Sequence, residues 1–187
     1  LDRPMFIESH RLAPYTPRGT DVSVILDLMI HDIDIIQDVV KSPVKEVWPI
    51  GVPVLNTEID IANARIAFEN GTVANVTASR VSTKTERKMR IFQHNAYIVV
   101  DFLEKTLATY HCAGGMPDNP QSIQGELETF DQEDALAAEI QSFRTSIQED
   151  RPPLVSGEDG ARALETAIRI ARQMQIPRLP GAEERGG

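Results

Sequence analysis

The stretch Val22–Val40, VSVILDLMIHDIDIIQDVV, decides how the rest of the chain is interpreted. It predicts one helix, with Thr20 or Asp21 as the N-cap and an end before Pro43, because proline cannot continue a helix. The helix is apolar on nearly every side, and helices of that kind are normally buried. We therefore expect this segment to be a buried helix.

Four polar residues of this helix fall on one line. Asp27, His31, Asp34 and Asp38 stand at i, i+4, i+7 and i+11, which is one stripe of an α-helix. A buried carboxylate is costly unless it is paired, so a line of them on an apolar helix needs a reason. One hypothesis is that the stripe faces a cleft, where His31 accepts a proton from a substrate hydroxyl and Asp27 orients the ring. The other is that the stripe faces solvent and carries an ordinary surface His–Asp pair.

The sequence on either side of this helix predicts a sheet. Met5–Leu12 is typical of a strand, and from Val44 onward runs of Val, Ile, Ala and Thr alternate with turn signals, of which Asn70-Gly71 is the clearest. We expect strands near 44–54, 58–68, 72–82, 87–94, 96–102 and 106–111, with a further extended piece around 123–130. Together with the helices, this order predicts an α+β fold: an open, largely antiparallel β-sheet covered on one face by helices.

Two helices are expected at the end of the chain. The first covers roughly 133–149, where Leu136, Ile140, Phe143 and Ile147 recur at helical spacing. The second follows a cap at 156–159, and its buried stripe is predicted to be Ala161, Leu164, Ile168 and Ala171. We expect residues 1–176 to form one domain and residues 177–187 a frayed tail.

Charge and cysteine content narrow the class of protein. The 187 residues carry 19 Lys+Arg and 28 Asp+Glu, a net charge of −9, which disfavours nucleic acid and anionic membranes as partners because phosphate contacts need clustered cations. Cys112 is the single cysteine, so a disulfide framework is excluded and a cytoplasmic location is expected. The longest apolar stretch, at 22–36, is too short and too charged to span a bilayer.

Glu8 and His10 are further candidates on the first strand. They alternate, so they share one face of that strand. They could join Asp27 and His31 at a cleft, or they could point into solvent. The same four residues form a His/carboxylate set that could bind a divalent ion, but we expect no metal.

A basic segment follows in the predicted sheet, and it consists of Arg80, Lys84, Arg87, Lys88 and Arg90. It could receive the phosphates of a nucleotide or sugar nucleotide, since guanidinium groups match phosphate geometry. It could equally be the solvated tip of a hairpin.

Several of these segments resemble the Gfo/Idh/MocA oxidoreductases. Asp27–Asp34 resembles the D-x-x-x-H-x-x-D helix of that family, and Phe6–Arg11 resembles the strand that enters its C-terminal domain. Ala64–Thr72 resembles its "a-x-i-x-F-x-n-G" hairpin, and Pro153–Gly160 with the helix after it resembles its ending. Within the family, residues 10–14 together with the helix are most similar to sugar-nucleotide dehydrogenases.

The resemblance implies the C-terminal half of a two-domain NAD(P)-dependent dehydrogenase that acts on a sugar or sugar-nucleotide hydroxyl. NAD or NADP would be bound mainly by an N-terminal Rossmann domain that is absent from this chain. His31 would be the acid–base residue and Asp27 its partner. The candidate substrate-binding residues are Asp34, His10, Glu8, Arg11, Arg80 and Arg87. The family also implies a homodimer or homotetramer formed through the sheet.

The sequence departs from the family pattern in two ways. It has no G-x-G-x-x-G loop, and the catalytic Glu-Lys-Pro motif of the family is missing, since Glu104-Lys105 is followed by Thr106. The chain alone is therefore predicted to be inactive. An alternative is a non-catalytic binding or assembly module that dimerises through its open sheet, because an uncovered sheet face usually finds a partner.

Overall fold

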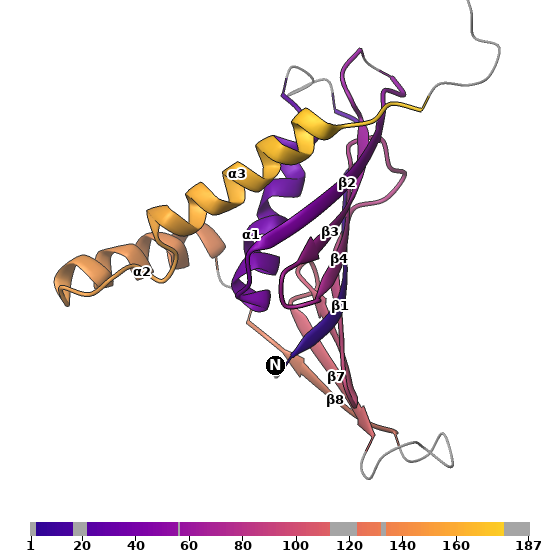
Figure 1. The fold of residues 1–187 in the computed structure, drawn as a ribbon. Coiled ribbons are helices and arrows are strands. Elements are labelled where there is room, and N and C mark those ends of the chain that lie inside the picture. Colours follow the sequence, from indigo (N-terminus) through magenta and orange to yellow (C-terminus); the bar gives the residue numbers. More distant parts are fainter. Residues whose placement is uncertain (1–2, 17–21, 56, 113–122, 132–133, 178–187) are drawn as a thin grey trace, which may run out of the picture.

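The structure is a computed structural model that describes residues 3–16, 22–55, 57–112, 123–131 and 134–177 (Figure 1). Within these residues, eight strands form one sheet in the order β2-β3-β4-β1-β5-β6-β7-β8. The strands are β1 (Pro4–Leu12), β2 (Val44–Val52), β3 (Ile61–Phe68), β4 (Val73–Ser79), β5 (Glu86–Gln93), β6 (Ala96–Asp101), β7 (Thr106–Cys112) and β8 (Ile123–Thr129). Only β1 and β4 pair in parallel, so the prediction of a largely antiparallel sheet is confirmed.

The helices lie on one side of this sheet. They are the π-helical turn η1 (Ile25–Met29), α1 (Ile30–Val40), α2 (Ala135–Gln148) and α3 (Gly157–Gln173). In Figure 1, α1 and α3 cross one face of the sheet, and no helix of the described chain covers the other face. The predicted open sheet with one covered face is therefore confirmed.

The core forms between α1 and the covered face. Ile33 and Ile36 of α1 are fully buried, and from the sheet Ile7, Ile66 and Phe68 join the same cluster. The predicted helix over 22–40 is confirmed from Ile25 to Val40, with Val24 as the N-cap and a first turn that is π-helical rather than α-helical. Such wider turns are rare and are often found at functional sites. The predicted N-cap residues Thr20 and Asp21 lie outside the described residues.

The buried face of α3 differs from the predicted one. Ala161 and Ala171 are exposed, and Leu164 and Ile168 keep 44% and 36% of their surface accessible. The side chains that turn inward are Ala163, Thr166, Ala167 and Ile170. Small side chains on this row let α3 pack closely against α1, which explains why this row is buried in place of the neighbouring row with larger side chains.

The hairpin between β3 and β4 confirms the turn predicted at Asn70-Gly71. Gly71 adopts a positive φ of 91°, a conformation in which a side chain would be strained. The Asn70 side chain accepts a hydrogen bond from the Thr72 N–H at 3.0 Å, which fixes the turn locally.

The segment after α3 returns to the sheet. The Gly51 N–H of β2 donates to the Gln175 carbonyl at 3.0 Å, so this edge strand has a partner. Of the predicted tail, residues 178–187 lie outside the described residues. No helix of the described chain has the length and apolar character needed to cross a membrane.

Candidate functional site

The site is built on the helical segment formed by η1 and α1. Ile25 and Met29 of η1 point into the core, as do Ile33 and Ile36 of α1. These side chains hold one side of the segment against the sheet, and the residues between them are left on the outer side.

The predicted stripe lies on that outer side. Asp27, His31 and Asp38 are exposed, and Asp34 is half-buried. Within the described chain, no hydrogen bond joins the Asp27 carboxylate to the His31 ring. The stripe is therefore accessible to a ligand or to another polypeptide, and this chain by itself builds no closed cleft around it.

Asp34 has the most distinctive electrostatic environment of the stripe. Partial burial, together with the negative charges of Asp159 and Asp38, raises the pKa of the Asp34 carboxyl above its usual range. Arg162 and His31 oppose this shift through their positive charge. Asp34 therefore interacts electrostatically with charged residues in the first turns of α3, Asp159 and Arg162.

A buried cluster under the stripe escaped the sequence analysis. The Asp32 carboxylate accepts a hydrogen bond from Ser9 Oγ at 2.8 Å and from Arg11 Nε at 2.6 Å. The side chains of Asp32 and Arg11 are only 1% and 11% exposed. Arg11 was predicted to bind substrate, but its guanidinium forms an ion pair with Asp32 of α1. The sequence did contain a signal for this cluster: Asp32 lies outside the polar stripe and next to Ile33, on the side of the helix expected to be buried, where a carboxylate needs a partner.

Glu8 and His10 do not lie near the stripe, so of the two alternatives for these residues the structure excludes a cleft shared with Asp27 and His31. Successive side chains of a strand point to opposite faces, and Ser9 and Arg11 occupy the face that α1 covers. Glu8 and His10 therefore point to the open face of the sheet. There Glu8 binds Arg90 at 2.9 Å, and His10 Nδ1 lies 3.3 Å from a Glu86 oxygen.

The same geometry rules out a single divalent-ion site built from the four residues considered in the sequence analysis. The sheet separates Glu8 and His10 from Asp27 and His31, so these four side chains cannot ligate one ion. Within the described residues, no group of three or more His, Cys, Asp or Glu side chains is arranged to hold a metal.

The predicted basic segment is divided between several environments. Arg80 is buried and donates to the Val22 carbonyl. Lys88 forms an ion pair with Asp101 at 3.0 Å on the open face, whereas Arg87 is exposed and lies opposite Arg11 on the covered face. Lys84 pairs with Glu86, and its hydrogen bond lowers the pKa of that carboxyl. The five cations therefore form no single patch, and phosphate binding by Arg80 or Arg87 stays a prediction.

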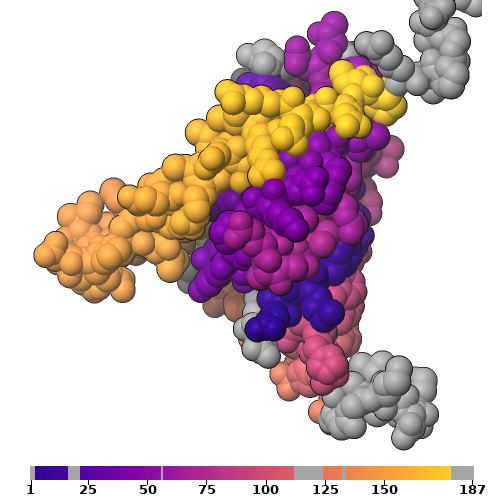
Figure 2. Space-filling model, in the orientation of Figure 1, coloured from indigo at the N-terminus to yellow at the C-terminus, as the bar shows by residue number. Residues whose placement is uncertain are grey.

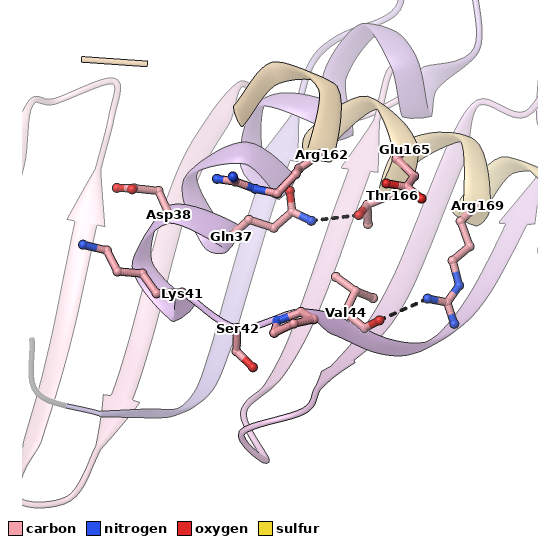
Figure 3. A pocket seen from close by; sticks show the side chains of 10 residues that line it. Gln37, Asp38, Lys41, Ser42, Val44, Arg162, Glu165, Thr166 and Arg169 are labelled. Carbon is pink, nitrogen blue, oxygen red and sulfur yellow. Dashed lines mark hydrogen bonds between the residues drawn. The ribbon is translucent and has the colours of Figure 1, made fainter. Parts of the chain in front are cut away.

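A hollow of about 640 Å³ lies beside the far end of the stripe (Figure 3). Gln37 Nε2 of α1 donates to Thr166 Oγ1 of α3 at 2.8 Å across it, and Arg169 donates to the Val44 carbonyl at 3.2 Å. These groups hold α3 against α1 and β2. Asp38 lines the hollow, but His31 and Asp27 do not.

Comparison with known proteins identifies the class. UDP-N-acetylglucosamine 3-dehydrogenase from Acidithiobacillus ferrooxidans is 40% identical over 167 residues, which are 89% of this chain and 53% of that enzyme. A solved structure of that dehydrogenase superimposes with a TM-score of 0.85 at 38% identity, over 92% of this chain and 55% of the other. Myo-inositol 2-dehydrogenase from Thermotoga maritima is 24% identical over 86% of this chain and 49% of that protein. The fold is thus that of a domain found in dehydrogenases of sugars and inositols.

The family itself follows from residues 5–99, which match the model of the GFO/IDH/MocA C-terminal domain. The chain belongs to the GFO/IDH/MocA family, as the sequence motifs predicted. It spans about half the length of the relatives that it matches. The structure of scyllo-inositol dehydrogenase from Lactobacillus casei, with NAD(H) and scyllo-inositol bound, shares the fold with a TM-score of 0.69 at 20% identity, over 92% of this chain and 55% of that one.

Proposed function

We propose that this chain is the substrate-binding half of an NAD(P)-dependent dehydrogenase that oxidises a hydroxyl group of a sugar or sugar nucleotide. The observation that carries the proposal is the outward row of Asp27, His31 and Asp34 on a largely apolar helix, with Asp27 and His31 exposed and Asp34 half-buried. The 40% identity to a sugar-nucleotide dehydrogenase supports the substrate class. The proposal places the protein in the cytoplasm, because a chain with a single cysteine has no internal disulfide and suits a reducing compartment.

The chain fits a cofactor that another part of the protein holds. Its sequence contains no glycine-rich loop for a dinucleotide phosphate, and its basic side chains are scattered or engaged. The exposed stripe leaves His31 open to a substrate presented beside such a cofactor. The oxidised nicotinamide, when bound, supplies the acceptor for a hydride from the carbinol carbon.

His31 would accept the proton of the substrate hydroxyl as that carbon becomes a carbonyl. The reaction is balanced, since the alcohol loses a hydride and a proton and the C–H and O–H bonds become one C=O bond. An imidazole suits this role because its ordinary pKa lies near neutral pH. Asp27, four residues earlier, would stabilise the imidazolium that forms.

Asp34 would hold the substrate through a hydrogen bond to a neighbouring hydroxyl. The pKa of Asp34 is raised by partial burial and by the nearby carboxylates, so a donor hydroxyl or an added cation would stabilise its charged form. Arg11 would act by fixing α1 in place. Arg87 lies on the face of the sheet that carries the helices, but its side chain is exposed, so it stays the candidate for a substrate phosphate.

The open face of the sheet would form a homodimer or homotetramer. The rings of Phe6, Phe92, Tyr97 and Tyr110 form a row across this face, with centroids 4.8–5.7 Å apart. Trp48 and Leu127, from β2 and β8, are 48% and 70% exposed. These apolar surfaces also favour the second candidate function, an assembly module without catalysis. Light scattering that shows a monomer at high protein concentration would rule out both forms of association.

The catalytic proposal is tested in the full-length protein. Purified enzyme is mixed with UDP-N-acetylglucosamine or an inositol and with NAD⁺ or NADP⁺, and reduced nicotinamide is followed by its absorbance. His31→Asn should lower kcat by about a hundredfold or more, as expected for loss of a general base, with a smaller change in KM. The matched control is His94→Asn, because His94 is exposed in the turn between β5 and β6. Turnover by His31→Asn at the wild-type rate on a substrate that the enzyme oxidises would refute the role of His31.

A further inference from the structure

Helix α2 carries an apolar row that no other described element covers. Leu136, Ile140, Phe143 and Ile147 lie at i, i+4, i+7 and i+11, and each is 60–66% exposed. No residue of α2 belongs to the hydrophobic core. Figures 1 and 2 show α2 standing out from the body, on the side of the sheet where α1 and α3 lie. We call these four side chains the α2 row.

The helix is well specified by its sequence despite this isolation. Asp134 caps its first turn by accepting hydrogen bonds from the Leu136 and Ala137 N–H groups at 3.0 and 3.3 Å. A helix of 14 residues is marginal on its own, and most of its stability normally comes from packing of its apolar side. The α2 row is therefore an apolar surface without a packing partner among the described residues.

The size of the row argues for a covalently attached partner. Four large side chains form a patch on the order of a few hundred Å², the size at which exposed apolar area marks an interaction site. A stable interface between separate proteins needs roughly 800 Å² on each partner. A segment of the same polypeptide can use a smaller patch, because its effective concentration is high.

The relatives contain further polypeptide beyond the part that this chain matches. This chain covers only 53% and 49% of two of the dehydrogenases that it matches, and 55% of a solved structure at 38% identity. We propose that the α2 row is the docking surface for the remainder of the full-length polypeptide, which packs on it in cis. This inference rests on the proposed function only in that the chain is part of a longer protein.

Docking at α2 would have a consequence for the site. Helices α1 and α2 lie on the same side of the sheet, so a segment that packs on α2 is brought to the side where His31 is exposed. The apolar contact would supply the attachment. The polar stripe stays available for substrate.

Hydrogen exchange tests the proposal directly. The amides of residues 135–148 are measured in the full-length protein and in the 187-residue chain. We expect exchange at least about tenfold slower in the full-length protein, because the packed helix opens less often. Replacing two members of the row, Ile140→Gln with Phe143→Gln, should remove most of this protection. The matched control is Ala138→Gln with Gln141→Lys, on the opposite, exposed side of α2, and it should keep it.

Each outcome decides between occupants. Equal exchange of residues 135–148 in the two proteins would overturn the proposal. Protection that appears in the 187-residue chain as its concentration rises, together with dimers in light scattering, would make a second copy the occupant and would also overturn it. Dehydrogenase activity is measured separately: an inactive full-length protein with a protected α2 would refute the proposed function but leave the docking intact.

Discussion

Removing the Asp32 carboxylate should lower the free energy of unfolding by about 3–5 kcal/mol, the usual cost of breaking a buried ion pair by deleting one partner. Asp32 is 1% exposed and binds both Ser9, at 2.8 Å, and Arg11, at 2.6 Å. Asp32→Ala would leave the Arg11 guanidinium nearly buried without its anion, and the Ser9 hydroxyl without its acceptor. The assay is urea denaturation of the purified chain, followed by circular dichroism. Asp38→Ala, at an exposed position of the same helix, is the control and should change stability by less than about 0.5 kcal/mol.

Two further variants separate charge from packing. Asp32→Asn keeps the shape and an acceptor for Ser9 but loses the charge, so its cost should fall between those of Asp32→Ala and the wild type. Asp32→Leu combined with Arg11→Met replaces the ion pair by apolar groups, and should recover most of the stability lost in Asp32→Leu alone. A cost below about 1 kcal/mol for Asp32→Ala, or a double variant less stable than either single one, would refute the reasoning.

Two more predictions follow from local geometry. The raised pKa of Asp34 means that, between its unfolded and folded pKa values, the folded chain holds a proton that the unfolded chain has released, so the free energy of unfolding falls as the pH rises through this interval. Asp34→Asn should remove this contribution and stabilise the fold at neutral pH, as measured by denaturation curves from pH 4 to pH 7. A pH dependence identical to that of the wild type would contradict the assignment. A Cβ at Gly51 would meet Ile59 Cγ2 and Met174 Sδ at 2.8 Å, so Gly51→Ala should cost about 1–2 kcal/mol in thermal unfolding. Gly160→Ala, in open space within α3, should instead stabilise by up to about 1 kcal/mol, and equal effects of the two substitutions would refute the packing argument.

The sequence was sufficient where a local pattern determines the structure. The Asn70-Gly71 turn, a helix that ends at Val40 and the order of helices and strands along the chain all follow from period and turn chemistry, and each is found. That Asp27, His31 and Asp38 share one side of the helix also follows from helical spacing, whereas the direction in which they point does not. These features need no knowledge of what packs against what.

Features that depend on the packing partner could not be predicted. Both faces of the second half of β1 are polar, with Glu8 and His10 on one and Ser9 and Arg11 on the other. Alternation of polar and apolar residues therefore gives no sign of which face α1 covers. In α3 two apolar rows compete, and the close approach of α1 selected Ala163 and Ala167 over the larger side chains.

The orientation of α1 shows how one buried polar residue can specify a site. The helix is apolar on nearly every side, so hydrophobic burial alone would allow several rotations about its axis. The observed rotation places Asp32 between Ser9 and Arg11, and a rotation that kept Asp32 buried away from these two side chains would leave its carboxylate without a partner. Because His31 is the adjacent residue, the rotation that satisfies Asp32 also turns His31 outward. We infer that the ion pair with Arg11 sets the direction in which the candidate acid–base residue points, although neither partner needs to touch the substrate.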